Sequence, residues 1–226
     1  MMLSAHPRIA KLSLIDSELI PNIDLWQLNL DHITPQEQAH AIVHLSYQEL
    51  ERAYRYHRSQ DQSQFILRRM LLKQVLASYS RLEPIDIQLE EDQYKKPHVL
   101  NGSRLQFNAS HTPKQGIIAV HPKVSVGVDI EQISAIEDRA YLLDQFASID
   151  EKRWVHTSVQ RFFMLWTIKE ALLKCQGTGF LGESVPPLDQ IPEQILENLY
   201  VARCQEYIIY STLWEKNWIS VCRPDD

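Results

Sequence analysis

The chain has 226 residues, 44% of them hydrophobic, and a formal net charge of -6, values that are ordinary for a soluble globular protein. The acidic balance argues against a general nucleic-acid binder, and no apolar run approaches the ~20 residues that a membrane-spanning helix requires. Three cysteines without a C-x-x-C pair indicate reduced thiols rather than a disulfide frame or a zinc site. No charged segment followed by an apolar run opens the chain, so we expect a cytoplasmic protein.

The first elements of the chain are a predicted strand and two capped helices. Hydrophobic alternation over residues 23–30 is typical of a strand. Thr34, followed by a proline and then by Glu37, forms a capping box that begins a helix. Ser46 and Glu49 repeat the capping box, which predicts a second short helix.

Positive charge is concentrated between residues 52 and 81, where seven basic residues stand against one acidic residue. Such a local excess in an acidic chain indicates an anion-binding surface. The helix predicted over residues 62–82 has a basic edge beside an apolar side. We favour a phosphorylated small molecule over nucleic acid, because the basic edge is short and has few aromatic residues. The seven basic residues are Arg52, Arg55, Arg58, Arg68, Arg69, Lys73 and Arg81.

The next segment predicts a strand over residues 85–89, a loop at Lys96 and Pro97, and a hairpin formed by residues 105–111 and 116–120. The first hairpin strand ends in Ser110 and His111, which are able to donate to a phosphate. A single histidine at such a position more often has a structural role, so both interpretations stay open.

The second informative strand covers residues 124–131. Its alternation places Gly127, Asp129 and Glu131 on one face, with the two carboxylates ~6.6 Å apart along the backbone. Two like charges repel unless a cation joins them, and Mg²⁺ prefers carboxylate oxygens and often shares its ligand shell with a phosphate. Gly127 is expected to leave an open surface beside them. The alternative is the solvent-facing side of an edge strand.

Helices are then expected over residues 137–147 and from Ser148, which forms a capping box with Glu151. A closing hairpin is predicted from residues 206–214 and 217–222.

Between them lies a helix predicted to begin at Thr157 and to end at Gly177. Apolar residues surround nearly its whole circumference, so it has to be largely buried. Glu170 and Lys174 nevertheless lie one turn apart on one face. An isolated pair of this kind is usually a surface ion pair, but on a buried helix a ligand or metal in a cleft is the simpler partner.

Three stretches together resemble the 4'-phosphopantetheinyl transferases of the surfactin-synthetase type. Residues 126–131, Val-Gly-Val-Asp-Ile-Glu, are similar to the glycine, aspartate and glutamate strand of that family. Trp166-Thr-Ile-Lys169-Glu170-Ala-Leu-Leu-Lys174 is similar to its Trp-x-x-Lys-Glu-Ala-x-x-Lys helix. Upstream, Lys96-Pro97 and residues 107–111, Phe-Asn-Ala-Ser-His, follow its Lys-Pro and Phe-Asn-x-Ser-His elements in the same order. Gln64 departs from the family, which often has an arginine there.

The resemblance implies an α+β fold of two similar α/β halves with pseudo-twofold symmetry, each a small, mostly antiparallel sheet packed with helices. Pro122 marks a boundary that agrees with this division. Residues 1–122 would form the coenzyme A-binding half, and residues 123–226 the half with the Mg-binding strand and the catalytic helix. A monomer is expected, with coenzyme A between the halves. Its phosphopantetheine arm would pass to a serine of an acyl or peptidyl carrier protein, leaving adenosine 3',5'-bisphosphate.

The resemblance also implies roles for individual residues. Asp129, Glu131 and Glu170 would hold Mg²⁺, Glu170 would act as general base, and Lys174 would contact the pyrophosphate. Lys169 would contact phosphate as a further catalytic residue or make a structural ion pair. The residues implied for binding coenzyme A are Arg58, Arg69, Lys96, Pro97, Ser110, His111, Asp129 and Lys174.

Two other functions remain compatible with these residues. One is a module that binds coenzyme A or another nucleotide without turnover, and the other is a Mg²⁺-dependent nucleotide hydrolase or phosphotransferase. As a transferase, the protein would fit fatty-acid, polyketide, nonribosomal-peptide or siderophore synthesis equally well. No nucleic acid or membrane partner is expected.

Overall fold

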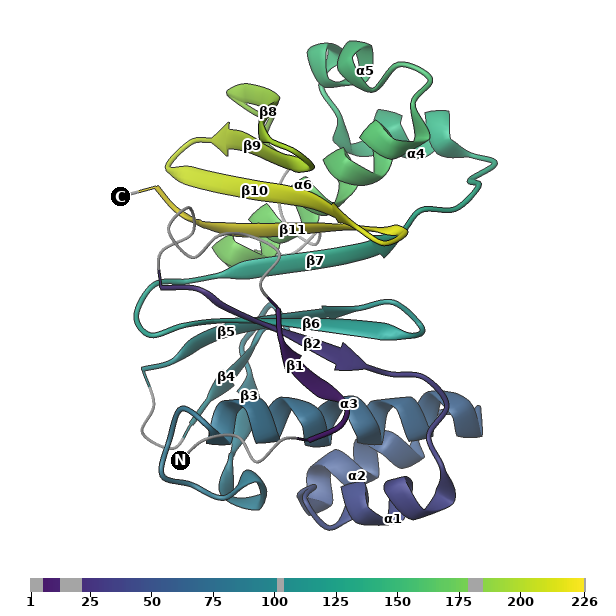
Figure 1. The fold of residues 1–226 in the computed structure, drawn as a ribbon, viewed down its shortest axis with the longest axis vertical. Coiled ribbons are helices and arrows are strands. Elements are labelled where there is room, and N and C mark those ends of the chain that lie inside the picture. The colour runs from purple at the N-terminus through teal and green to yellow at the C-terminus, as the bar shows by residue number, and fades with distance from the viewer. Residues whose placement is uncertain (1–5, 13–21, 101–103, 179–184, 226) are drawn as a thin grey trace.

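Two antiparallel sheets pack face to face in the middle of the molecule, and each carries helices on its outer face (Figure 1). The structure is a computed structural model that describes residues 6–12, 22–100, 104–178 and 185–225. The four-stranded sheet has the order β1-β2-β6-β5 and the five-stranded sheet the order β7-β11-β10-β9-β8, while β3 and β4 pair separately. Within the described residues, no helix is long and apolar enough to span a membrane.

The N-terminal half confirms both early capping boxes, since the Thr34 and Ser46 side chains accept from the backbone N–H groups of Glu37 and Glu49. The strand predicted over residues 85–89 is wrong. Pro84 fixes a helical φ and begins a 3-10 turn there, so the strand starts only at Leu89. The elements are β1 (Ile9–Lys11), β2 (Asp24–Asn29), α1 (Pro35–Ile42), α2 (Tyr47–Tyr54), α3 (Ser59–Ala77), the 3-10 turn η1 (Pro84–Asp86), β3 (Leu89–Glu91), β4 (Pro97–Val99), β5 (Gln106–His111) and β6 (Gln115–His121).

The C-terminal half confirms the capping box of Ser148 and the closing hairpin. The central helix is capped by Ser158, one residue later than predicted, because its side chain accepts from the N–H of Arg161. Gly177 ends this helix as expected, with a left-handed φ of 79°. The edge strand β8 escaped prediction because most of its residues are exposed and show no alternation. The elements are β7 (Gly127–Gln132), α4 (Arg139–Phe146), α5 (Ile149–Val155), α6 (Val159–Gln176), β8 (Gln190–Leu196), β9 (Leu199–Cys204), β10 (Tyr207–Trp214) and β11 (Asn217–Pro224).

The two halves repeat one packing device. In each, the glutamate of a Ser-x-x-Glu capping box pairs with a fully buried lysine on the long helix that covers the sheet. Glu49 of α2 pairs with Lys73 of α3 at 3.2 Å, and Glu151 of α5 pairs with Lys169 of α6 at 2.5 Å. The fold is therefore α+β, with two similar halves of helix-covered antiparallel sheet.

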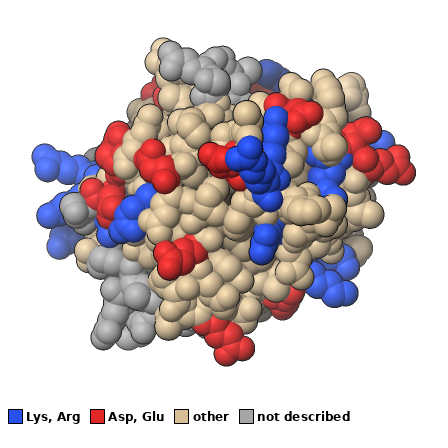
Figure 2. Space-filling model, turned by 90° about the horizontal axis from the view of Figure 1, so that it is seen from above, with Lys and Arg blue, Asp and Glu red and all other residues tan. Residues whose placement is uncertain are grey.

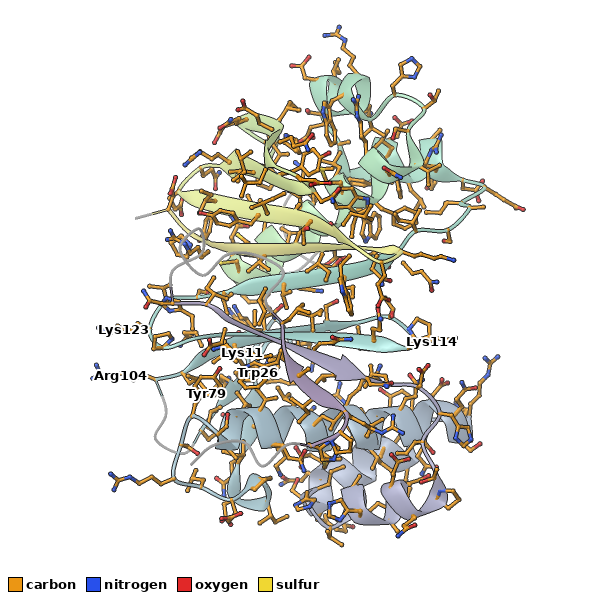
Figure 3. All side chains as sticks on the ribbon, in the orientation of Figure 1. Lys11, Trp26, Tyr79, Arg104, Lys114 and Lys123 are labelled. Carbon is orange, nitrogen blue, oxygen red and sulfur yellow. The ribbon has the colours of Figure 1, made fainter. Side chains whose placement is uncertain are left out.

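The N-terminal half is also tied together by a chain of polar contacts between β2 and the end of α3. The Trp26 indole donates to the Tyr79 hydroxyl at 2.7 Å, and that hydroxyl donates to Asp24 Oδ2 at 2.6 Å. Figure 3 shows Trp26 and Tyr79 close together beneath the four-stranded sheet, with Lys114 marking the turn between β5 and β6 at one end of that sheet.

An apolar core lies between the two sheets. Side chains of β2 and β6 meet those of β7, β9, β10 and β11 there, and Val126, Val128 and Ile130 are fully buried in it. Strand β5, the edge of the first sheet, runs beside β7, the edge of the second. The Asn108 side chain joins them by accepting from the N–H of Val128 at 2.9 Å. This meeting of two sheet edges positions the site described below.

Candidate active site

Gly127 is the point of closest approach between β7 and α6. A Cβ added there would lie 2.0 Å from the carbonyl oxygen of Ala171 and 2.5 Å from the backbone nitrogen of Cys175. The expectation that Gly127 leaves an open surface beside the carboxylates is therefore wrong, because the helix backbone occupies that space. The glycine allows α6 to lie directly on β7, and its neighbour on the same face, Asp129, is only 2% exposed.

Asp129 is the centre of a charged cluster under α6. Its Oδ1 accepts from Lys174 Nζ at 2.6 Å and from the Ser110 hydroxyl at 2.8 Å. Its Oδ2 is buried and has no hydrogen-bond partner within the described residues. A buried carboxylate oxygen without a partner is costly, which indicates a place for a further ligand.

Glu131 and Glu170 face the same cluster. Burial, followed by the negative charge of Asp129, raises the pKa of Glu131 to about 7, while the Trp166 indole donates a hydrogen bond to it. Burial and repulsion from Asp129 also raise the pKa of Glu170 to about 6, against the opposing charge of Lys174. The site thus holds more negative charge than its lysine balances.

The donor set fits a hard divalent cation. Within the described residues, no three His, Cys, Asp or Glu side chains are already arranged around a common metal position. However, the partnerless Oδ2 of Asp129 and the two carboxyl groups with raised pKa values are oxygen donors that a cation would relieve. The predicted set of Asp129, Glu131 and Glu170 is consistent with this need.

Lys169 does not reach this cluster. It is fully buried on another face of α6, where its Nζ pairs with Glu151 Oε1 at 2.5 Å and donates to the carbonyl oxygen of Pro186. Of the two roles that the sequence left open, the structure has the ion pair. The role of Lys169 as a catalytic contact to phosphate is thus not supported by its position.

Removing Lys169 should mainly affect folding. We expect Lys169→Met to lower the free energy of unfolding by roughly 3 kcal/mol, since it leaves Glu151 as an unpaired buried charge. The matched control is Lys152→Met in α5, whose partly exposed pair with Asp144 should be worth under about 1 kcal/mol. Urea denaturation measures both changes, and equal effects of the two substitutions would contradict the structural role.

Two cavities flank β5. The larger, about 630 Å³, lies by the β3–β4 turn and the end of α6; we call it the turn cavity. The smaller, about 310 Å³, lies between β5 and α3; we call it the arginine cavity, because Arg52, Arg68 and Arg69 line it. Pro97 lines both. An elongated ligand could therefore follow β5 from one cavity to the other.

Alternation along β5 separates Ser110 from His111. Both line the arginine cavity, but the Ser110 hydroxyl bonds Asp129 of the C-terminal half, whereas the His111 ring lies on the Arg68 side of the cavity. There Arg68 Nη1 lies 2.9 Å from His111 Nδ1. Sequence analysis placed Arg68 in the basic stretch but did not select it as a ligand of coenzyme A. A further signal was its place one helical turn after Gln64, whose side chain donates to the carbonyl oxygen of Pro113 in the turn after β5.

The other residues predicted to bind coenzyme A differ in whether they line one of the two cavities. Arg69 lines the arginine cavity but lies 3.6 Å from Glu49, and Lys96 lines the turn cavity with its ammonium already bonded to the end of α6. Arg58 is exposed at the N-terminal cap of α3 and does not line either cavity. Four of the seven basic residues between positions 52 and 81 form ion pairs with acidic residues from outside that stretch.

The pKa of His111 gives a test of the arginine cavity. Burial and then the charge of Arg68 lower it to about 4, so the imidazole is neutral at pH 7. We expect an NMR titration to show no protonation of His111 above pH 5, and Arg68→Met to raise its pKa. Because the folded pKa lies below the unfolded value, His111 should also cost stability as the pH falls from 6.5 towards 4. A midpoint near 6.5 would contradict this geometry.

The chain is similar to known proteins over most of its length. The chain matches the model of the 4'-phosphopantetheinyl transferase N-terminal region over residues 31–123, and that of the 4'-phosphopantetheinyl transferase superfamily over residues 125–212. It is 29% identical over 181 residues to the 4'-phosphopantetheinyl transferase HetI of Nostoc sp., an overlap that covers 76% of this chain and 74% of HetI.

Two other relatives carry the same description. The 4'-phosphopantetheinyl transferase gsp of Aneurinibacillus migulanus is 32% identical over 132 residues, which are 55% of this chain and 53% of gsp. The 4'-phosphopantetheinyl transferase Sfp of Bacillus subtilis is 22% identical over 151 residues, which are 65% of this chain and 66% of Sfp. The chain belongs to the 4'-phosphopantetheinyl transferase superfamily, and its enzyme class is phosphopantetheinyl transferase.

The surface of the C-terminal half carries charges of both signs. Figure 2 shows Lys and Arg side chains mixed with Asp and Glu across the face seen from above, rather than a single basic field. Such a face does not favour the phosphate backbone of a nucleic acid.

Proposed function

We propose that this chain transfers the 4'-phosphopantetheine group of coenzyme A to a serine hydroxyl of an acyl or peptidyl carrier protein, in a Mg²⁺-dependent reaction that releases adenosine 3',5'-bisphosphate. The observation that supports it most is the cluster of three carboxyl groups and Lys174 where the two halves meet, next to two cavities along β5. Family membership supplies the substrate class.

Asp129, Glu131 and Glu170 would hold Mg²⁺ against the pyrophosphate of coenzyme A. When bound, the ion withdraws charge from phosphoryl oxygens. Lys174 adds a positive charge beside Asp129, where it can offset the charge that develops on the leaving phosphate. Together these groups would neutralise a pyrophosphate that the buried carboxylates alone would repel.

The bonds exchanged are defined by the products. The carrier serine oxygen attacks the phosphorus that bears the pantetheine arm and forms a new phosphoester bond. The bond from that phosphorus to the bridging oxygen breaks, and adenosine 3',5'-bisphosphate keeps that oxygen and the electron pair. The serine proton has to be accepted at the site. Glu170, whose pKa is raised to about 6 by burial, is suited to accept it at neutral pH.

Coenzyme A would bind along β5. The arginine cavity offers the Arg68 guanidinium, beside neutral His111, for an anionic phosphate group. Arg69 and Ser110 remain in the proposed binding set, since each lines this cavity, and Pro97 joins it to the turn cavity. Arg58 lines neither cavity.

Mass spectrometry tests the proposal directly. Purified protein is incubated with apo carrier proteins, coenzyme A and Mg²⁺, and a carrier should gain the mass of one phosphopantetheine group on its serine. Omitting Mg²⁺ or adding EDTA should abolish the gain. Binding of coenzyme A with no carrier ever modified would instead indicate a non-catalytic binding module. Release of inorganic phosphate without a carrier would indicate a hydrolase.

A further inference from the structure

A lysine of the N-terminal half holds the C-terminal end of α6. Lys96 lies in the turn between β3 and β4, and its Nζ donates to the carbonyl oxygens of Lys174 at 2.7 Å and Cys175 at 3.4 Å. It also donates to the hydroxyl of Ser125, just before β7, at 3.0 Å. These bonds link the two halves of the molecule.

The end of α6 needs such partners. Carbonyl groups in the last turn of a helix have no partner within the helix. The N–H groups of Gly177 and Thr178 both donate to the carbonyl of Leu173, so the carbonyls of Lys174 and Cys175 must be satisfied from outside. The Lys96 ammonium and the Ser125 hydroxyl supply those donors. A positive charge at this end also complements the helix dipole.

The β3–β4 turn is built to direct this lysine. Asp92 Oδ1 accepts from the backbone N–H groups of Tyr94 at 2.9 Å and Lys96 at 3.0 Å, and Lys95 takes a left-handed φ of 67°. The exposed turn thus places the half-buried ammonium group of Lys96 against the end of α6. Burial of this group lowers the pKa of Lys96, a cost that the bonds to α6 have to offset.

We propose that Lys96 is a positioning residue for the transfer reaction. By fixing the last turn of α6 against β7, it holds Lys174 and Glu170 in place relative to Asp129 and Glu131. Lys96 donates to the backbone carbonyl oxygen of Lys174, and the side chain of Lys174 pairs with Asp129. The inference rests on the proposed function. It assigns Lys96 a positioning role instead of a direct contact to phosphate, because its ammonium group already donates to oxygen atoms of the protein.

The test separates positioning from substrate binding. Lys96→Met should lower kcat about 10-fold to 100-fold, since small displacements of catalytic groups have effects of that order. The Kd for coenzyme A, measured by calorimetry, should change much less. Hydrogen exchange of the amides in the last turn of α6 should become faster. Lys96→Arg keeps the charge and the donors, so it should restore part of kcat.

The matched control is Lys95→Met, the same change at the neighbouring exposed lysine, which should leave kcat and exchange rates near those of the wild type. A Lys96→Met variant with a raised Kd and an unchanged kcat would overturn the inference in favour of a phosphate contact. Unchanged kcat together with unchanged hydrogen exchange would overturn it as well. If the wild type modifies no carrier, the proposed function itself fails, which is a distinguishable result.

Discussion

Replacing Asp129 by asparagine should abolish most of the transferase activity while the protein stays folded. The change keeps the size of the side chain but removes the buried charge that pairs with Lys174, and with it the oxygen donor that lacks a partner. Loss of one such charged group from a preorganised site typically costs ~100-fold to 1,000-fold in kcat. The mass-spectrometric carrier assay measures the loss, and circular dichroism confirms the fold.

Asp144→Asn is the matched control, since it makes the same chemical change on an exposed carboxylate that pairs with Lys152 in the same half. It should leave activity close to that of the wild type. Calorimetry with Mg²⁺ gives a second readout, in which only Asp129→Asn should weaken ion binding. An Asp129→Asn enzyme with full activity would show that the metal assignment is wrong.

A single methyl group at Gly127 should damage both stability and activity. The Cβ of Gly127→Ala would overlap the backbone of α6 at Ala171 and Cys175, which cannot move aside as a flexible side chain would. Overpacking of this kind costs about 1–3 kcal/mol, and more where backbone is involved. Displacement of α6 from β7 would also move Glu170 and Lys174 away from Asp129.

Gly116→Ala tests whether the close approach is the cause. The three atoms nearest to its Cβ would be side-chain carbons of Leu28 and Leu30, at 3.3–3.4 Å, so a small adjustment suffices. We expect urea denaturation to show a clearly smaller loss of stability for Gly116→Ala than for Gly127→Ala. Comparable losses from the two substitutions would indicate that the contact between β7 and α6 is not what restricts residue 127.

Local signals were sufficient for much of the fold. The capping boxes at Thr34, Ser46 and Ser148 and the stop at Gly177 were correct because each depends on residues only a few positions apart. The strand predicted over residues 85–89 failed because a proline-initiated turn can carry the same alternation.

The site was harder to derive because its details depend on how two halves pack. Helical spacing placed Glu170 and Lys174 on one face, and strand alternation placed Asp129 beside Glu131. Neither pattern could show that α6 lies directly on β7 at Gly127. Whether Lys169 contacts phosphate or makes a structural ion pair likewise stayed open until the packing of α5 on α6 paired it with Glu151.

By itself, the sequence determined the residue types of this protein's chemistry and their spacing along single elements, because periodicity and capping are properties of neighbours in the chain. Only the tertiary structure decided which charges meet across the boundary between the halves. The bonds of Lys96 to Lys174 and of Ser110 to Asp129 cross that boundary and join residues 78 and 19 positions apart, while Arg68 and His111, 43 positions apart, meet within the N-terminal half. Such distant pairs are brought together by the packing of apolar sheet and helix faces, which no local pattern specifies.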